Sequence, residues 1–578
     1  ENDEEVFVAH APDSELTVAG RYLDSLIDRD IEYVFANAGT DFAPIIEAIV
    51  HATEVGRSIP KFLTVPHENV AISMAHGYYR ISGKPAVVMV HVTVGTANTV
   101  CGIMNAARDN IPMLLAAGHT PHTESGHAGS RDVWIHWGQD SFDQGGMVRE
   151  YVKWDYELRA GQPVDALVGR ALDIAMSEPR GPVYMTLPRE VLDQKPVTDP
   201  ARKRNRSLGT IAPAPATAAI DKVAAAIAGA EFPVILTSTL GRDPHNVSLL
   251  AQLADTWGIA VIQASARDIN IPSNHPMNLG TRADDVLKQA DLILCIDCEV
   301  PWFPKTIQPN PDATLIHIAP DPFFSRFPYR GFAMDVAVAG STSLAMPMLL
   351  EALAANKKTN PRRIDKRRQA IAAIHHTRSE QHREFLEKAA GMRPIHPAWI
   401  AACVNQVKQK NTIIVDEMGV SMDFLELQEP GSYITSSLAG GLGMGLGAAV
   451  GAKLAASDRD VILLVGDGAY MFGNPTPAHF IAVADKIPTL TVVLNNSRWH
   501  AVHASTVGMY PQGRAAKSRT MPLVELEPSP RFDKTMQACG GHGEKVTDPE
   551  KLVAAMERGL KAVAGGTPAL VNVITRPR

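Results

Sequence analysis

A strand–turn–helix–strand pattern in the C-terminal third of the chain most restricts its fold. An apolar run at 461–465 is followed by Gly-Asp-Gly, a helical stretch, a second apolar run at 490–494 and an Asn-Asn pair. Two such runs joined by a helix predict neighbouring parallel strands. The carboxyl ends of parallel strands lie at one edge of an open sheet, where these folds bind ligands. We therefore expect Asp467 and Asn496 to approach each other at that edge.

The residue types in this pattern predict a magnesium–diphosphate site. A carboxylate and an amide oxygen suit a hard cation such as Mg²⁺, which keeps other positions for water and phosphate oxygens. Gly466 and Gly468 would let the backbone approach a diphosphate, whose charge the next helix N-terminus favours. We also expect Ala469, the next residue, to contact the molecule that carries this diphosphate. A Gly-Asp-Gly turn alone is common at strand ends, but its combination with the Asn-Asn pair after the next strand is specific.

Two earlier parts of the chain show the same alternation of apolar runs and helical segments, which is typical of α/β layering. The charged, proline-rich segment at 202–218 is typical of an interdomain linker. We therefore predict the α/β class with three consecutive open parallel-sheet domains. The predicted boundaries are 1–198 for the first domain, 213–355 for a central Rossmann-like domain, 356–394 for a solvated linker helix and 395–578 for the third domain.

Composition and charge argue against several functional classes. The chain has a formal net charge of -7 and 20% charged residues, so no basic surface for nucleic acid is predicted. Five cysteines without dense spacing favour a reducing compartment. No apolar run is long enough to cross a bilayer, and the acidic residues 1–5 are unlike a signal peptide. We expect a cytoplasmic protein that acts on a small molecule, without a nucleic-acid or membrane partner.

The Gly-Asp-Gly and Asn-Asn pattern resembles that of the thiamine-diphosphate (ThDP) enzymes, which include acetolactate synthase, pyruvate oxidase, pyruvate decarboxylase and benzoylformate decarboxylase. The resemblance covers nearly the whole chain, in the order pyrimidine-binding, central and diphosphate-binding domain. It implies ThDP and Mg²⁺ as cofactors, with the side chains of Asp467 and Asn496 and the backbone carbonyl of Arg498 as metal ligands. Trp499 departs from the tyrosine that many members have at this position, a change that affects the pocket more than the metal.

A glycine-dense segment, 436–451, leads into a predicted helix. Its spacing does not match the dinucleotide pattern GxGxxG, so a nucleotide site is not favoured over close helix packing. The resemblance implies instead that this segment holds the aminopyrimidine ring of ThDP. Leu442 would force the bent cofactor conformation, the Gly440 carbonyl would accept from the 4′-amino group, and Gly441 would line the site. The Ala-Gly-Gly-Leu-Gly run is closest to that of benzoylformate decarboxylase.

Glu68 follows an apolar run at 62–65 and precedes a predicted helix. A lone glutamate at a helix start is usually a favourable partner of the helix dipole. The resemblance implies a different role, because ThDP needs a carboxylic acid that hydrogen-bonds to its pyrimidine and favours the imino tautomer. We therefore predict that Glu68 activates the cofactor.

Two positions resemble the substrate pocket of benzoylformate decarboxylase. Thr40 stands where that enzyme binds the substrate carboxylate, and His91 stands where it has a catalytic histidine. Imidazole titrates near neutral pH, so His91 could relay a proton, although a histidine that only caps a strand is the alternative. Trp499, His500 and His503 would lie on the substrate side. A histidine-rich segment at 119–136 lacks an HxxxH pattern or a cysteine partner, so it does not predict a separate metal site.

The resemblance leaves several activities open. In a decarboxylase, the ThDP ylide attacks a 2-oxo acid, CO₂ leaves and the enamine is protonated to an aldehyde. An acetolactate synthase-like carboligase, a transferase, captures the enamine with a second carbonyl compound. A flavin-containing oxidase is less favoured, because the segment 237–242 lacks clustered glycines. We predict a decarboxylase of small 2-oxo acids, a lyase, that forms a homodimer or homotetramer with sites at the interface; intact Glu68, Asp467 and Asn496 argue against a non-catalytic binding protein.

Overall fold

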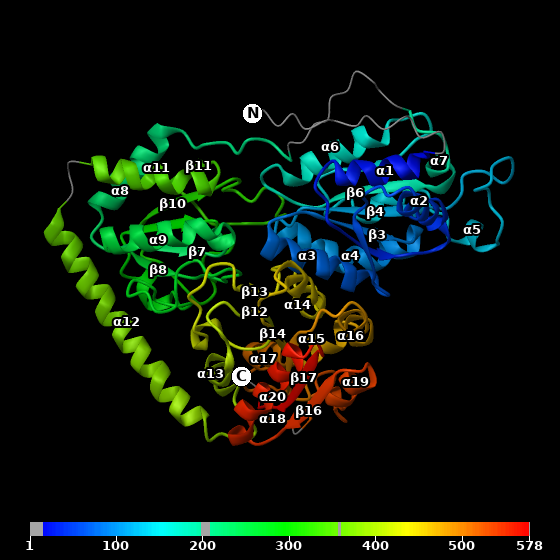
Figure 1. Cartoon of the computed structure of the whole chain (residues 1–578). Helices are drawn as coiled ribbons and strands as arrows, with labels where there is room; N and C mark the ends of the chain where they lie inside the picture. Colours follow the sequence, from blue (N-terminus) through cyan, green and yellow to red (C-terminus); the bar gives the residue numbers. More distant parts are fainter. Residues whose placement is uncertain (1–15, 198–207, 357–359, 519, 577–578) are drawn as a thin grey trace, which may run out of the picture. The chain divides into compact units, whose positions relative to one another are not determined.

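The computed structural model describes residues 16–197, 208–356, 360–518 and 520–576 (Figure 1). The chain forms two compact units. Unit 1 comprises the described residues within 1–68, 85–103 and 112–210, and unit 2 comprises those within 69–84, 104–111 and 211–578. The predicted linker at 202–218 lies in part outside the described residues, and the acidic segment at 1–5 lies wholly outside them. Among the helices of the described residues, none is both long and apolar enough to cross a membrane.

Unit 1 is built on a sheet of six parallel strands in the order β2-β1-β3-β4-β6-β5. The strands are β1 (Tyr33–Asn37), β2 (Lys61–Thr64), β3 (Ala86–Val90), β4 (Met113–His119), β5 (Asp155–Glu157) and β6 (Val183–Pro188). Strands β3, β4 and β6 are buried along their whole length, as expected for parallel strands covered on both faces. All six carboxyl ends therefore lie at one edge, where predicted site residues from several strands can meet.

The helices of unit 1 complete its core. Helix α1 begins after Thr17, whose side chain accepts a hydrogen bond from the Gly20 N–H and so caps the helix. The buried residues of α1 pack in one cluster with those of α6 and of the sheet. The short elements after β1 and β4 carry polar residues to the carboxyl edge. The bounds are α1 (Val18–Ile27), η1 (Thr40–Phe42), α2 (Ala43–Glu54), α5 (Ile135–Gly138), η2 (Gly145–Met147), α6 (Val164–Met176) and α7 (Arg189–Leu192).

Unit 2 contains a central sheet of five parallel strands in the order β11-β10-β9-β7-β8. Its strands are β7 (Pro233–Thr237), β8 (Ala260–Ile262), β9 (Leu292–Ile296), β10 (Thr314–Ala319) and β11 (Val336–Ala339). Its helical elements are α8 (Thr217–Gly229), η3 (Leu240–Arg242), α9 (Pro244–Trp257), α10 (Asp284–Leu287) and α11 (Thr342–Ala355). The apolar side chains of these strands and helices form a single buried cluster.

A second sheet of unit 2 has six parallel strands in the order β13-β12-β14-β15-β17-β16. Its strands are β12 (Ile413–Glu417), β13 (Tyr433–Thr435), β14 (Val461–Gly466), β15 (Leu490–Asn495), β16 (His542–Val546) and β17 (Ala569–Ile574). Helices α13 and α20 share a buried cluster with this sheet. The helical elements are α13 (Pro397–Val407), η4 (Met422–Phe424), α14 (Met444–Ala455), α15 (Asp467–Phe472), α16 (Pro475–Ala484), α17 (His500–Met509), α18 (Arg514–Lys517), α19 (Phe532–Ala538), η5 (Pro549–Lys551) and α20 (Leu552–Ala564).

The three open parallel sheets confirm the predicted fold class, whereas the exact domain boundaries stay predictions. Between the two sheets of unit 2 in sequence, a single long helix, α12 (Pro361–Ala389), begins after Asn360, whose side chain accepts from the Arg363 N–H. Most of α12 is exposed. Arg367, Ile371 and Ala389 are buried. The guanidinium of Arg367 donates to the backbone carbonyls of Trp257 and Ile227. This contact holds the helix against the central sheet's helices.

Two helices cross the boundary between the units in sequence: α3 (Glu68–Ser82) and α4 (Val92–Arg108). Within unit 2, residues 69–82 of α3 pack closely against α14. A Cβ atom added to Gly451 would lie 2.0 Å from the Met74 carbonyl oxygen, and one added to Gly77 would lie 2.0 Å from the Ala448 carbonyl oxygen. Only residues without a side chain allow this approach of two backbones. Close helix packing therefore accounts for part of the glycine-dense segment.

Buried ion pairs join the segments 69–84 and 104–111 to the central sheet's loops, all within unit 2. Arg80 pairs with Asp268, and Arg267 pairs with both Asp109, at 3.2 Å, and Glu299. All five side chains are buried. Because a buried charge without its partner is very costly, this network fixes the position of both segments on the central sheet.

Candidate active site

In unit 1, the predicted residues Glu68 and His91 lie after β2 and β3, the two strands that flank β1, at the carboxyl edge of the sheet. Glu68 is the first residue of α3 and follows β2, and His91 directly follows β3. The Glu68 carboxylate is buried and accepts a hydrogen bond from Asn98 Nδ2 at 3.1 Å. The negative charge of Glu68 contributes to raising the pKa of His91. The charge of Glu68 therefore affects the protonation of His91.

His91 is held by a residue that the sequence did not single out. Its Nδ1 atom lies 2.5 Å from Oδ1 of Asp41, whose side chain is 3% exposed. This hydrogen bond raises the pKa of His91, burial opposes the rise, and the charges of Asp41 and Glu68 add to it. With Nδ1–H donated to Asp41, the Nε2 atom is the one available for proton transfer. It lies 3.4 Å from Nε2 of Gln139.

The backbone around His91 is shaped for this contact. A Cβ atom added to Gly39 would lie 2.1 Å from His91 Nδ1, so the ring packs against bare backbone. Val92 has a φ of 30°, which is an outlier for a β-branched residue, and its N–H donates to Asp41 Oδ2 at 3.4 Å. Such strain persists only where surrounding contacts impose it, and it concentrates at functional sites. Thr40 is exposed and precedes Asp41 in the same turn.

In unit 2, strands β14 and β15 are neighbours, with Gly466 paired to Leu494. Asp467 begins α15, and its carboxylate accepts from the Ser497 N–H at 2.7 Å and the Gly468 N–H at 2.9 Å. The ends of the two strands therefore meet, as the sequence predicted. Burial raises the pKa of Asp467 to about 6, and hydrogen bonds from backbone N–H groups oppose this rise.

The two asparagines of the pair have different surroundings. Asn495 is buried, and its Nδ2 donates to Ser529 Oγ at 2.8 Å and to Asn572 Oδ1 at 3.1 Å, which are structural contacts. Asn496 is half-buried at the sheet edge, and its Oδ1 accepts from the Arg498 N–H at 3.0 Å. The Asn495 side chain is thus engaged inside the domain, whereas that of Asn496 lies at the sheet edge.

Trp499 covers the turn after β14. A Cβ atom added to Gly468 would lie 2.2 Å from Cζ3 of Trp499, so the indole packs directly on the turn. Phe472 meets the same indole edge to face, with ring centroids 5.7 Å apart. His500 and His503 stack at the start of α17, with ring centroids 6.4 Å apart. Trp499, with Phe472 packed on its indole, thus covers the Gly-Asp-Gly turn.

The loop with Gly440, Gly441 and Leu442 is held by two polar residues that sequence reasoning missed. Glu417, at the end of β12, is buried and accepts from the N–H groups of Gly443 at 2.6 Å, Met444 at 3.2 Å and Gly445 at 2.7 Å. Burial raises the pKa of Glu417 to about 7, and these hydrogen bonds oppose the rise. Glu417 thereby binds the N-terminal N–H groups of α14 and fixes the loop that precedes it.

Asn105 is the second of these residues. Its Oδ1 accepts from the Gly441 N–H at 3.1 Å, and its Nδ2 donates to the Gly441 carbonyl at 2.8 Å. Gly440 has a φ of 69°, a conformation that favours glycine. Leu442 is half-buried between these anchored positions. A carboxylate at a strand end is the signal by which Glu417 could have been found, whereas Asn105 lies in a helix without a distinguishing pattern.

The family comparison agrees with these observations. The central TPP enzyme model matches residues 220–349, the N-terminal TPP binding domain of thiamine pyrophosphate enzymes matches residues 16–147, and the C-terminal TPP binding domain matches residues 418–573. This chain belongs to the thiamine-diphosphate enzymes. Thiamine diphosphate is therefore the cofactor that its domains bind, and the chain is a carbon–carbon lyase or a carboligase.

Known ThDP enzymes resemble the chain over most of its length. It is 24% identical to a probable acetolactate synthase of Mycobacterium bovis over 536 residues, covering 89% of each protein. It is 26% identical to the benzoylformate decarboxylase of Pseudomonas aeruginosa over 489 residues, covering 81% of this chain and 84% of that enzyme. The fold is similar to that of a 4-hydroxybenzoylformate decarboxylase of Rhodococcus jostii RHA1, with a TM-score of 0.78, 22% identity, and coverage of 97% of this chain and 100% of that one.

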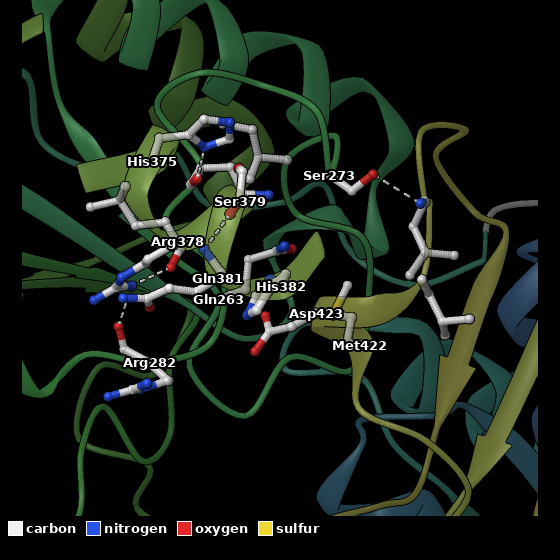
Figure 2. A pocket seen from close by; sticks show the side chains of 16 residues that line it. Gln263, Ser273, Arg282, His375, Arg378, Ser379, Gln381, His382, Met422 and Asp423 are labelled. Carbon is white, nitrogen blue, oxygen red and sulfur yellow. Dashed lines mark hydrogen bonds between the residues drawn. The ribbon is translucent and has the colours of Figure 1, made fainter. Parts of the chain in front are cut away.

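One cavity of this ThDP enzyme contains none of the expected cofactor residues. It lies within unit 2 and is lined by the loop after β8, the middle of α12 and η4 (Figure 2). His375 Nδ1 donates to the Asn278 carbonyl, and Arg378 donates to the carbonyls of Leu279 and Arg282. These hydrogen bonds join α12 to the segment that follows β8 in the central sheet.

Proposed function

We propose that this ThDP enzyme is a Mg²⁺-dependent 2-oxo acid decarboxylase of the benzoylformate decarboxylase type. The Asp41–His91 pair carries the proposal. A decarboxylase must place a proton on the carbon that loses CO₂, whereas a carboligase must keep that carbon unprotonated until a second carbonyl compound arrives. A histidine that an aspartate orients, and whose pKa is raised, is suited to deliver this proton from Nε2.

Glu68 is the proposed activating acid. ThDP, when bound, supplies the carbon nucleophile that adds to the 2-oxo group. The buried Glu68 carboxyl group would hydrogen-bond to the aminopyrimidine, and Asn98 holds it in place through the 3.1 Å hydrogen bond. In the other half of the site, the Gly440 carbonyl would accept from the 4′-amino group and Gly441 would line the ring. Leu442 would support the bent cofactor conformation.

The residues at the ends of β14 and β15 fit a diphosphate with Mg²⁺. The side chains of Asp467 and Asn496 and the backbone carbonyl of Arg498 are the proposed protein ligands, since oxygen ligands of this type suit Mg²⁺. Gly466, Gly468 and Ala469 are the proposed contacts for the diphosphate. The buried Asp467 carboxylate has no cationic side chain among its hydrogen-bond partners in the described residues, so a bound cation would balance its charge.

The proposed substrate is a small 2-oxo acid. Thr40 is exposed beside Asp41 at the carboxyl edge, and we assign it to the substrate carboxylate. Trp499 and Phe472 offer an aromatic surface beside the cofactor turn. We further propose a homodimer or homotetramer in which Glu68 of one subunit and Asp467 of another complete each site, as the family resemblance implies.

A carboligase is the second candidate, and the similarity to acetolactate synthases favours it. A flavin oxidase is less well supported. The turn after β7 uses its backbone N–H groups within the protein: Ser238 and Thr239 donate to the Asp297 carbonyl, and Gly241 donates to Asn270 Oδ1. These groups are therefore occupied by protein acceptors and are not presented to a flavin diphosphate.

A product-partition assay distinguishes the two candidates. The enzyme is supplied with ThDP, Mg²⁺ and a panel of 2-oxo acids, with and without an aldehyde acceptor, and both CO₂ and organic products are measured. We expect aldehyde as the main product of the wild type. His91→Ala should lose aldehyde formation and shift the remaining turnover toward 2-hydroxy ketone, while His127→Ala, an exposed histidine of unit 1, should not. Hydroxy ketone as the main wild-type product would establish the carboligase instead.

A further inference from the structure

Two histidines and a glutamate converge in unit 1, apart from the residues assigned to ThDP and Mg²⁺. His119 is the last residue of β4, His122 follows it in the next loop, and Glu157 is the last residue of β5. His119 Nε2 lies 3.8 Å from Glu157 Oε2, and His122 Nε2 lies 3.6 Å from Glu157 Oε1. One possible ligand atom from each residue lies within 4.8 Å of the others. The two imidazole rings stack, with centroids 4.6 Å apart.

The sheet brings these residues together. Strand β6 pairs with β4 on one side and with β5 on the other, and all three are parallel. His119 is opposite Pro188, and Glu157 is opposite Thr186, so both side chains are at the same carboxyl edge. Glu157 is far from the histidines in sequence, which is why the histidine-rich segment by itself did not predict a metal site.

The contacts within the cluster do not satisfy its polar atoms. His119 Nδ1 lies 2.6 Å from the Thr120 carbonyl oxygen, so Nδ1 carries the hydrogen and Nε2 carries the lone pair. Neither His–Glu distance is short enough for a hydrogen bond. A cation bound between the His119 Nε2 atom and the Glu157 carboxylate would be favoured by the negative charge of the carboxylate.

The spacing also fits a common ion. Tetrahedral zinc with bonds of about 2.0–2.1 Å places its ligand atoms roughly 3.3–3.4 Å apart. The observed separations are 3.8 Å from His119 Nε2 to Glu157 Oε2 and 3.6 Å from His122 Nε2 to Glu157 Oε1. One ligand atom from each residue lies within 4.8 Å of the others, so rotation of the side chains would bring all three onto one ion. Two imidazole nitrogens and one carboxylate oxygen suit a zinc-type ion, whereas Mg²⁺ prefers oxygen ligands. The hydrogen bond from His119 Nδ1 to a backbone carbonyl is the outer contact that metal-bound histidines usually have.

We propose that His119, His122 and Glu157 bind one divalent transition-metal ion of the zinc type. Three protein ligands leave the fourth position open. The side chains of His122 and Glu157 are 43% and 40% exposed, so this position is accessible to water or to a small oxygen-donor ligand. The site uses no residue assigned to ThDP or Mg²⁺, so it is a second metal site that does not depend on the proposed function.

Zinc titration of an untagged enzyme tests the site, since a histidine tag would itself bind zinc. The chelator-treated protein is first saturated with ThDP and excess Mg²⁺, so that the Asp467 site is filled, and Zn²⁺ binding is then followed by calorimetry. Co²⁺ serves as a spectroscopic probe of coordination. We expect one Zn²⁺ per chain in the wild type and in the control His127→Ala, a histidine in the loop after β4 that is not part of the cluster.

His122→Ala and Glu157→Gln should each weaken Zn²⁺ binding by about 100-fold or more, since even the outer contacts of a metal site contribute about 10–100-fold. Both side chains are partly exposed, so these variants should fold, which circular dichroism checks. Asp467→Ala should keep its Zn²⁺ site even if it loses ThDP, which separates this proposal from the proposed function. Equal Zn²⁺ affinity in the wild type and both ligand variants, or no Zn²⁺ binding to the wild type, would overturn the proposal.

Discussion

His91 Nδ1 and Asp41 Oδ1 lie 2.5 Å apart, although the two residues are 50 positions apart in sequence. The carboxylate follows β1 and the imidazole follows β3, and these strands are neighbours in the sheet. The pair fixes which ring nitrogen faces the open edge, and it raises the pKa of the imidazole. It therefore links the order of the strands to the proton transfer that the proposed reaction requires.

Asp41→Asn should lower the pKa of His91, because it removes the hydrogen-bonded charge that is the main cause of the rise. The histidine must be protonated to deliver its proton, so activity falls as pH increases through this pKa. The alkaline limb of the kcat profile should therefore move to lower pH in the variant. Because the pKa of His91 is higher in the folded than in the unfolded protein, the pair also stabilises the fold. This stabilisation is complete at pH values below the pKa of His91 in the unfolded chain, and it is lost as the pH rises through the pKa in the folded protein. An alkaline limb at the wild-type pH would contradict the role of Asp41.

Glu68→Gln should reduce kcat by about 10²-fold or more with little change in ThDP binding, because an amide cannot share a proton with the pyrimidine as a carboxyl group does. Steady-state kinetics and ThDP calorimetry measure the two effects. Glu54→Gln is the control, since Glu54 is the last residue of α2 and is exposed. Near wild-type turnover in Glu68→Gln would remove this residue from the mechanism.

Asp467→Ala should abolish tight ThDP binding even at high Mg²⁺, because the diphosphate and the metal would lose the buried carboxylate that joins them. Calorimetric titration with ThDP measures the loss. Asp458→Ala changes an exposed carboxylate just before β14 and should leave binding unchanged. Tight binding in Asp467→Ala would reject the metal assignment.

Gly451→Ala should destabilise unit 2, because the added methyl group would lie 2.0 Å from the Met74 carbonyl oxygen. Forcing α3 and α14 apart should cost about 1–3 kcal/mol in the free energy of unfolding. Gly508→Ala is the control: this glycine is the second-last residue of α17 with open space around it, so alanine should be neutral or stabilise by up to about 0.5 kcal/mol. Denaturant unfolding distinguishes the two, and equal stability of both variants would contradict the close packing.

Co-expression of Glu68→Gln with Asp467→Ala tests the proposed assembly. If each site combines Glu68 and Asp467 from different subunits, a mixed dimer collects both lesions in one site and leaves the other site intact. Random pairing should then restore about a quarter of wild-type activity. If one subunit supplied both residues, every site would carry a lesion, and mixtures with differential tags would stay inactive.

Local patterns were sufficient for much of the architecture. The apolar runs at 461–465 and 490–494 predicted strands β14 and β15, because a buried parallel strand must be apolar along its whole length. The residues that follow such strands then had to meet at the carboxyl edge, which is why Asp467 and Asn496 could be paired from the sequence. Three repeats of this alternation were enough to predict three open sheets.

Contacts between distant segments depended on tertiary structure. The sequence marked His91 but not Asp41, and it marked His119 and His122 but not Glu157. Asp41 lies just after β1 and Glu157 is the last residue of β5. The distance from each of them to its histidine depends on strand order and register, which apolar periodicity alone does not determine. The same holds for Glu417, because a carboxylate at the end of β12 accepts from the start of α14 only after the helix packs beside that strand. The sequence thus determined which chemical groups stand at the strand ends, and the tertiary structure decided which of them act together.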